Sequence, residues 1–306
     1  MIGRQRHRPG NRTTSLLGLL ALGISCAHAQ LVVHSDENLD SSRTEAWAMN
    51  YVGAATFMTA FGETPALKAW SWGLAVDAGY IPKLTAAQQR VGLHGIKQED
   101  LNRSQVFGRL RVLLGLPGDF VATVGYTPPI TIDGVQALDL FSFAIARRLL
   151  EHDDLSLSMQ IFGQHGRLQG DITCPKRLSD ITDITLNPFG CRGPSNDHVY
   201  LNYYGLEAVG AWTIRSWHPY VSGGVVRTEF QVRVDAMTFD VHDRSHLTAR
   251  GSLPFGTVGT TVDLDPHWSL GAEVLYVPLN VQRRPNMPSQ NDQLTSARIQ
   301  LLYRFD

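Results

Sequence analysis

The sequence predicts an all-β protein, an antiparallel up-and-down transmembrane β-barrel of about ten strands. Three observations predict this fold: an export signal opens the chain, apolar and polar residues alternate with period two in many later segments, and short turns alternate with mostly longer polar connections. No later stretch approaches roughly 18 unbroken apolar residues, so the pattern predicts no membrane-spanning helix.

The first 29 residues have the features of a cleaved signal peptide. Four arginines, the last of them Arg12, precede an apolar stretch over 15–25, and Ala27-His28-Ala29 is a small-x-small cleavage site. A membrane anchor is disfavoured, because a stretch of about 11 residues is too short to span a bilayer as a helix. We therefore expect residues 1–29 to be removed and the mature chain to begin at Gln30.

Removing this leader makes the chain more acidic. Four of the 27 Lys and Arg residues lie in it, which leaves 23 against 28 Asp and Glu residues, a net charge of −5. A nucleic-acid partner would require a basic face, so the composition argues against one.

The C-terminal segment shows the strand pattern most clearly. Every second residue from Ala297 to Phe305 is apolar, and four of the five alternating positions are polar. This is the pattern of a strand with lipid on one side and a polar lumen on the other. The segment resembles the closing strand of bacterial outer-membrane barrels, which commonly ends on an aromatic residue; here Asp306 follows it. The resemblance implies recognition by the barrel-assembly machinery.

Similar alternation upstream gives ten strands in a barrel domain over 68–306. The expected strands are 68–81, 105–116, 119–128, 136–150, 154–165, 198–214, 218–236, 246–264, 267–279 and 294–305. Alternation is imperfect in 136–150, 198–214 and 246–264, and Pro254 interrupts the last, as expected only at an edge or bulge.

The connections also alternate in length. Short turns surround Pro117, Asp153, Ser216 and Pro266, whereas the other connections, at 82–104, 129–135, 166–197, 237–245 and 280–293, are mostly longer and polar. Short periplasmic turns and longer outer loops are typical of outer-membrane barrels. An even number of strands predicts that both termini lie on the periplasmic side.

Residues 30–67 do not share the strand pattern. Small and apolar residues from Thr44 to Phe61 occur without clean period two. This N-terminal segment could be a short helix, a periplasmic segment, a plug in the lumen or an extra strand, and the sequence leaves these alternatives open.

The strand register predicts a set of charged residues that point into the lumen. They are Asp77, Arg109, Arg111, Glu207, Arg227, Glu229, Arg233, Asp235, Glu273, Arg298 and Arg304. Because a ten-stranded barrel is only slightly wider than an eight-stranded one, whose interior side chains can fill it, near-balanced charges favour a salt-bridged polar core. A narrow pore for a small solute is the alternative.

Cysteine usage predicts one disulfide. Cys26 leaves with the leader, so Cys174 and Cys191 are the only cysteines of the mature chain, and both lie in one stretch rich in Pro, Asp and Gly. An even pair in one loop of an exported protein indicates a disulfide rather than two free thiols.

One pair of residues suggests an enzyme alternative. Asp240 and His242 lie on the same side of an extended segment, where the carboxylate could orient the imidazole as a general base. The pair resembles part of the motif of omptins, ten-stranded outer-membrane proteases with an Asp-x-His in one outer loop and an Asp pair in another. The Asp pair is missing, because the 129–135 loop offers Asp133 alone. Two polar residues in a polar loop are usually solvated.

More broadly, the chain resembles uncharacterised outer-membrane β-barrel proteins of Gram-negative bacteria. The resemblance rests on the alternating strands, on Leu116-Pro117-Gly118-Asp119 followed by Gly125-Tyr126-Thr127-Pro128-Pro129, and on Asn187-Pro188-Phe189-Gly190-Cys191. It implies a cell outer-membrane location and contact with lipid.

The expected function is therefore non-enzymatic. The protein would be either a narrow pore for a small solute or a structural or binding barrel, and the sequence does not choose between them. A soluble periplasmic β-sandwich is a further alternative, because its strands also alternate. The histidines show no metal-ligand spacing and no phosphate-binding loop is present, so we expect neither a cofactor nor a metal site.

Overall fold

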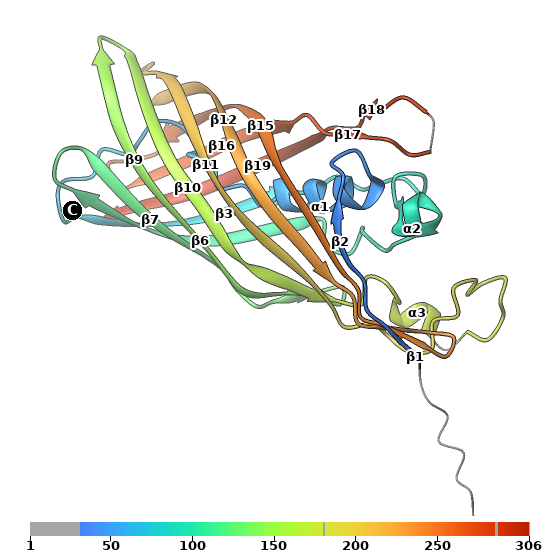
Figure 1. Ribbon diagram of the computed structural model, residues 1–306. Coiled ribbons are helices and arrows are strands. Elements are labelled where there is room, and N and C mark those ends of the chain that lie inside the picture. The colour runs from blue at the N-terminus through green and yellow to red at the C-terminus, as the bar shows by residue number, and fades with distance from the viewer. Residues whose placement is uncertain (1–30, 180, 285–286, 306) are drawn as a thin grey trace, which may run out of the picture. The chain divides into compact units, whose positions relative to one another are not determined.

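Ten antiparallel strands close into a barrel in the computed structural model (Figure 1). In chain order they are β3 (Trp72–Tyr80), β6 (Val106–Leu116), β7 (Phe120–Thr127), β9 (Val135–His152), β10 (Leu155–Gly170), β11 (Asp197–Trp212), β12 (Trp217–Arg233), β15 (His246–Asp263), β16 (Trp268–Val277) and β19 (Leu294–Phe305). Each strand pairs with the next of these ten, and the last, β19, pairs with β3. The predicted fold class is confirmed.

The structure describes residues 31–179, 181–284 and 287–305. The predicted leader over 1–29 and the mature start at Gln30 lie outside these residues, as does Asp306. Within the described part of the chain, no helix is long and apolar enough to cross a membrane.

Smaller elements attach to the margin of the barrel or lie between its strands. They are β1 (Leu31–Val33), β2 (Asp36–Leu39), α1 (Thr44–Ala54), β4 (Arg90–Val91), α2 (Gly92–Gly95), β5 (Lys97–Gln98), β8 (Thr131–Ile132), α3 (Lys176–Ser179), β13 (Ala236–Thr238), β14 (Val241–Asp243), β17 (Asn280–Val281) and β18 (Gln290–Asn291). Except for β1, β2 and α1, which precede β3 in the chain, these elements lie within the longer connections.

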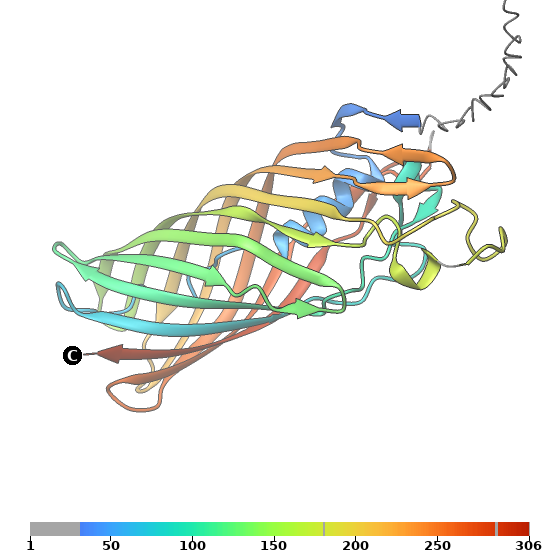
Figure 2. The same cartoon turned by 90° about the horizontal axis from the view of Figure 1, so that it is seen from below.

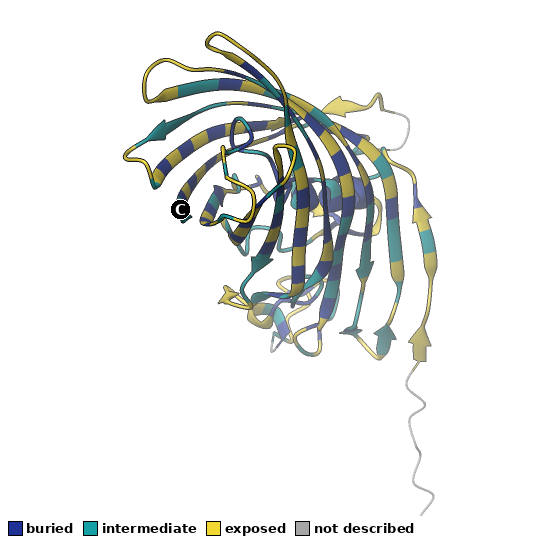
Figure 3. Cartoon of the chain, turned by 90° about the vertical axis from the view of Figure 1, so that its left-hand side faces the viewer, coloured by how far each residue is buried: buried dark blue, intermediate teal, exposed yellow. Residues whose placement is uncertain are grey.

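Buried and exposed residues alternate along the barrel strands, as the banding in Figure 3 shows. The outward residues are mainly apolar. Aromatic rings lie on this surface both near the short turns and near the longer connections. Trp72 stacks on Phe305 at 3.7 Å near the short turns, and Tyr80 and Tyr276 are exposed near the longer connections. An apolar band between two aromatic girdles is the exterior of a membrane barrel.

The register predicted for β12 is wrong. Val226 and Phe230 are fully buried inside the barrel, whereas Arg227, expected in the lumen, is exposed. The cause is helix α1, because the ring of Phe230 lies directly against Gly53 of that helix. An apolar helix inside the barrel reverses the usual rule that inward residues are polar.

Pro254 sits where its missing N–H can be tolerated. Pairing between β15 and β16 ends at Gly256, and β2 pairs with β15 only over 246–249. Residues 250–255 therefore have no strand partner on that side among the described residues. This is the edge-like position expected of a proline in a strand.

The N-terminal segment runs from one end of the barrel to the other. Strand β1 pairs with β14 and β2 pairs with the start of β15, both in parallel and both at the end with the longer connections. Helix α1 follows, and an extended segment over 55–64 leads through the lumen towards β3, which starts near the short turns. Figure 2 shows α1 between the strands.

This path corrects the prediction that both termini lie on the periplasmic side. Phe305 does lie at the end with the short turns, beside Trp72. Leu31, where the described chain begins, pairs with Val241 at the opposite end. The prediction assumed that the chain enters the first strand directly, but the segment before β3 first crosses the lumen.

Candidate functional site

The plug, as we name residues 44–64, consists of helix α1 and the extended segment that follows it. Nine of the eleven helix residues are buried. The helix lacks a single apolar stripe because its neighbours lie on several sides, namely β12, β15, α2, β4 and β17, instead of one core. Glu45 in its first turn accepts hydrogen bonds from Arg43 at 2.9 Å and from the backbone N–H of His94 at 2.7 Å.

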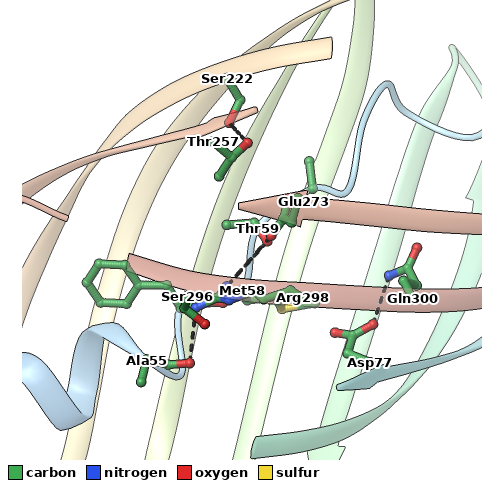
Figure 4. A network of polar contacts seen from close by, with 12 residues as sticks. Ala55, Met58, Thr59, Asp77, Ser222, Thr257, Glu273, Ser296, Arg298 and Gln300 are labelled. Carbon is green, nitrogen blue, oxygen red and sulfur yellow. Dashed lines mark hydrogen bonds and ion pairs between the residues drawn. The ribbon is translucent and has the colours of Figure 1, made fainter. Parts of the chain in front are cut away.

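The extended part of the plug pairs with no strand in the described ranges, so its backbone groups need other partners. Three buried arginines on the barrel wall supply them. Arg298 donates to the carbonyls of Ala55 and Phe57 at 3.0 and 2.8 Å, as Figure 4 shows for Ala55. Arg109 donates to the Thr56 carbonyl at 2.6 Å, and Arg111 donates to the Thr59 carbonyl at 2.9 Å.

Two buried glutamates complete the contacts between plug and wall. Glu273 accepts a hydrogen bond from the Thr59 hydroxyl at 2.5 Å and one from Tyr220 at 2.8 Å. Glu207 accepts from the backbone N–H of Ala60 at 3.0 Å. These groups come from different sides of the barrel, so the plug is held across the full width of the lumen.

A third carboxylate belongs to the wall itself. Asp77 on β3 accepts from Arg111 at 2.5 Å and from Gln300 at 2.8 Å. Arg111 therefore links this carboxylate to the plug. In the middle of the barrel the buried charges are paired with one another or with the plug backbone.

Four of the eleven residues expected in the lumen are elsewhere, and one lies on the inward face at an end of the barrel. Arg227 and Glu229 lie on the outer face because the β12 register is reversed, and Glu229 pairs with Arg250 at 2.6 Å. Arg233 is exposed beside Tyr200, and Asp235 lies in the loops that follow β12. Arg304 lies on the inward face of β19 at the end with the short turns, where it pairs with Asp263. The structure places the other six inside, namely Asp77, Arg109, Arg111, Glu207, Glu273 and Arg298.

Beside α1, in the half of the barrel near the longer connections, lies an apolar cavity of about 480 Å³. Met49 and Val52 of the plug form one side of it, and Ala137, Leu168 and Val199 of the wall form another. Its volume is within the range that accommodates a small organic molecule, roughly 300–1,000 Å³. Sequence reasoning missed this cavity, because its lining comes from a helix and strands far apart in the chain.

The roof segment, as we name residues 82–105, covers this cavity at the end with the longer connections. Arg103 fixes it to two neighbouring loops, since its guanidinium lies 3.2 Å from the carboxylate of Asp171 and donates to the carbonyl of Asp133 at 3.0 Å. Within the roof segment, burial raises the pKa of Glu99 to about 7, although the Lys97 ammonium 3.0 Å away favours the ionised form.

One polar atom at the cavity has no partner. The hydroxyl of Thr127, the last residue of β7, is buried and has no hydrogen-bond partner within the described part of the chain. Thr127 also lines the cavity. Such a group is normally satisfied in a folded protein, so it is a candidate contact for a ligand with one polar group.

The disulfide predicted between Cys174 and Cys191 is present. It lies in the connection between β10 and β11, packed against Ala236. Asn187 bonds both the N–H and the carbonyl of Cys191, at 2.9 and 3.0 Å. The disulfide therefore organises an outer loop and contributes nothing directly to the lumen.

The predicted Asp240 and His242 pair does not form the contact that a general base would need. Asp240 is almost fully exposed and pairs with Arg192 at 3.2 Å. His242 instead contacts Asp235, with 2.5 Å between Nε2 and Oδ1. Within the described residues, no cluster of His, Cys, Asp and Glu could hold a metal ion.

The fold and the site define the class: a closed ten-stranded β-barrel of the outer-membrane type whose lumen holds its own N-terminal segment. The sequence matches no protein-family model and no curated protein.

Solved structures similar to this chain are barrels of low identity. They include Ail, the attachment invasion locus protein of Yersinia pestis (8% identity, 78% of this chain and 100% of that one, TM-score 0.32). The translocator domain of the autotransporter NalP from Neisseria meningitidis covers 79% of this chain and 91% of its own at 11% identity and a TM-score of 0.38. The outer membrane protease OmpT from Escherichia coli covers 77% and 94% at 10% identity and 0.32.

Proposed function

We propose that the protein is a non-enzymatic barrel of the outer membrane that binds one small, uncharged, apolar molecule in the cavity beside α1. The observation that carries this proposal is the cavity itself, which is closed towards the short turns by the plug. Lipid of the outer membrane contacts the outward apolar residues, and the last strand, β19, is the segment that the assembly machinery would recognise.

The plug favours a binding barrel over an open pore. Its backbone is bonded to buried side chains of several wall strands, among them Arg109 on β6, Gln160 on β10 and Arg298 on β19. An open path for ions would require these contacts to break. The near-balanced lumen charges hold the plug in place instead of lining a water-filled channel.

The electrostatics of the cavity favour an uncharged ligand. The acidic side chains at its margin are paired, Glu99 with Lys97 and Asp100 with Arg103. A charged ligand would lose its hydration without gaining a free counter-charge. An apolar molecule with a single polar group would gain both the burial of its surface and a bond to the Thr127 hydroxyl.

Photolabelling of the refolded protein tests the proposal. The probe is 1-azidoanthracene, a small apolar photolabel, and labelled peptides are located by mass spectrometry. We expect labelling of peptides that contain the cavity residues Val52 and Ala137. The variant Val52→Trp fills the cavity and should abolish this labelling, whereas Val112→Trp, which adds the same bulk on the outer face, should leave it unchanged.

Labelling that is spread over the outer face, or that is equal in Val52→Trp and the unmodified protein, would contradict the proposal. Two further outcomes would contradict other parts of it. Release from cells without detergent would exclude the membrane location. Turnover of a peptide panel that is lost in His242→Ala would exclude a non-enzymatic role.

A further inference from the structure

We infer that the cavity exchanges its occupant sideways with the outer leaflet of the membrane, through a break in the barrel wall. The wall break, as we name it, lies between residues 106–109 of β6 and residues 128–132, which continue β7 towards the turn before β9. This inference rests on the proposed function, because it supplies the route by which a small apolar molecule reaches that site.

Strand pairing defines the wall break. Strand β7 separates β6 from β9, but its pairing with β6 begins only at Leu110 and its pairing with β9 ends at Leu140. Beyond Thr127 the chain continues alongside β9, because β8 pairs with β9 over residues 135–136 in the same register as β7. Among the described residues, therefore, residues 106–109 of β6 have no strand partner on the side of residues 128–132.

Local sequence explains why the ladder stops there. Pro128 and Pro129 follow β7 directly and have no N–H to donate to a neighbouring strand. On the other side of the break the pairing of β9 with β10 shifts register near Gly166, and Asp139 takes a positive φ of 53°. A bulge of this kind bends a strand, and the ladder between β9 and residues 128–130 is interrupted at the same level.

Side chains from both faces of the wall line the same cavity. Val76, Val106 and Leu110 point outward and are about half exposed, at 53%, 53% and 48%. Met49 of the plug is buried inside the barrel, yet it lines the cavity with them. The cavity therefore reaches the outer face through the wall, and the unpartnered Thr127 hydroxyl lies at the end of the interrupted strand.

The other two directions are closed. Towards the short turns, Arg109 is bonded to Thr56 of the plug at 2.6 Å and to Gln164 at 2.8 Å. Towards the longer connections, Arg103 holds the roof segment to the loops at Asp133 and Asp171. The wall break is the side on which an apolar molecule meets apolar side chains along its whole path.

The break also lies at the depth where lipid begins. Val106 pairs with Tyr80, which belongs to the aromatic level near the longer connections, and Leu110 pairs with Tyr126. An aromatic girdle marks the interface between headgroups and acyl chains. An apolar molecule dissolved in the outer leaflet would therefore meet the break without passing through water.

Uptake of a membrane-dissolved probe tests this route. The full protein is reconstituted in liposomes of phosphatidylcholine loaded with 1-aminoanthracene, and the fluorescence change on binding is followed in time. Val106→Trp should narrow the break and slow uptake about tenfold, which corresponds to about 1.4 kcal/mol of added barrier. The matched control Val112→Trp lies on the same strand and face, is equally exposed, and should leave the rate unchanged.

The remaining outcomes separate this inference from the proposed function. If binding at equilibrium is normal, and the rate is unaffected by Val106→Trp but accelerated by Arg103→Met, the probe passes through the roof segment and the sideways route is wrong. If the unmodified protein binds no probe even at equilibrium, the proposed function fails and the route fails with it.

Discussion

The substitution Arg298→Ala should release the plug while the barrel stays folded. Arg298 is buried and donates hydrogen bonds to the carbonyls of Ala54, Ala55 and Phe57 at 3.3, 3.0 and 2.8 Å. Its guanidinium also lies 3.8 Å from the carboxylate of Glu273. No other side chain bonds as many plug carbonyls among the described residues.

The magnitude follows from what the substitution leaves behind. A hydrogen bond to a charged group contributes about 1.5–3 kcal/mol, but three bonds from one guanidinium do not add independently. Removing one member of a buried ion pair costs about 3–5 kcal/mol, because the other charge stays buried. Since Glu273 keeps its bonds to Thr59 and Tyr220, we expect a loss of about 3–4 kcal/mol in the free energy that docks the plug.

Hydrogen exchange measures this loss directly. The amide of Ala60 donates to Glu207, so it exchanges only when the plug leaves the wall. A loss of about 3–4 kcal/mol should speed exchange in the 55–64 peptide by roughly a hundredfold to a thousandfold. Peptides from β7 should stay protected. The control is Arg227→Ala, which removes an outward arginine that bonds Ser252 alone among the residues that the structure describes. Equal exchange in the two variants, or loss of protection throughout the barrel, would refute the reasoning.

Three further outcomes are expected. Reduction of the Cys174–Cys191 disulfide should make the 171–196 loop sensitive to protease and leave the strands resistant, because the bond, worth about 3 kcal/mol in the chain-entropy model, closes only that loop; global unfolding would contradict this. The raised pKa of Glu99 means that its contribution to the roof segment is present below about pH 4.5 and is lost as the pH rises through about 7. Exchange of that segment, corrected for intrinsic rates, should therefore be faster at high pH, and Glu99→Gln should remove the difference. An epitope inserted after His34 should be labelled on intact cells, whereas one inserted at Gly118 should not, because these positions lie at opposite ends of the barrel.

The barrel could be predicted from the sequence because its governing signal is local. A strand between lipid and lumen needs alternate residues of opposite character, and each segment shows this without reference to its neighbours. All ten predicted ranges overlap the observed strands, including 136–150, 198–214 and 246–264, where alternation was imperfect. The disulfide was predictable for the same reason, since both cysteines lie in one loop.

The sequence left a plug in the lumen as one of several alternatives for residues 30–67 and could not select it, because the partners of the plug are distant in sequence. Helix α1 lacks an apolar stripe, and the segment after it lacks period two. Neither segment would be stable alone. Both depend on groups such as Arg109, Glu207 and Arg298, which follow 50 to 250 residues later in the chain. A sequence pattern indicates which face of an element is buried. It does not indicate that a barrel lumen provides burial on every side.

The reversed register of β12 and the wall break have one origin. A narrow barrel filled by side chains would need polar residues inward at every strand, and the sequence analysis placed Arg227 and Glu229 there on that assumption. An apolar helix in the half near the longer connections requires apolar partners instead, which Val226 and Phe230 provide. The same helix is too slender to fill that half of the lumen, so an apolar cavity remains beside it, and the cavity is bounded where β7 stops short. The outward position of Arg227 on β12 thus results from the apolar interior at this level of the barrel. A barrel strand whose charged residues face outward and whose apolar residues face the lumen therefore indicates a second apolar element inside the barrel.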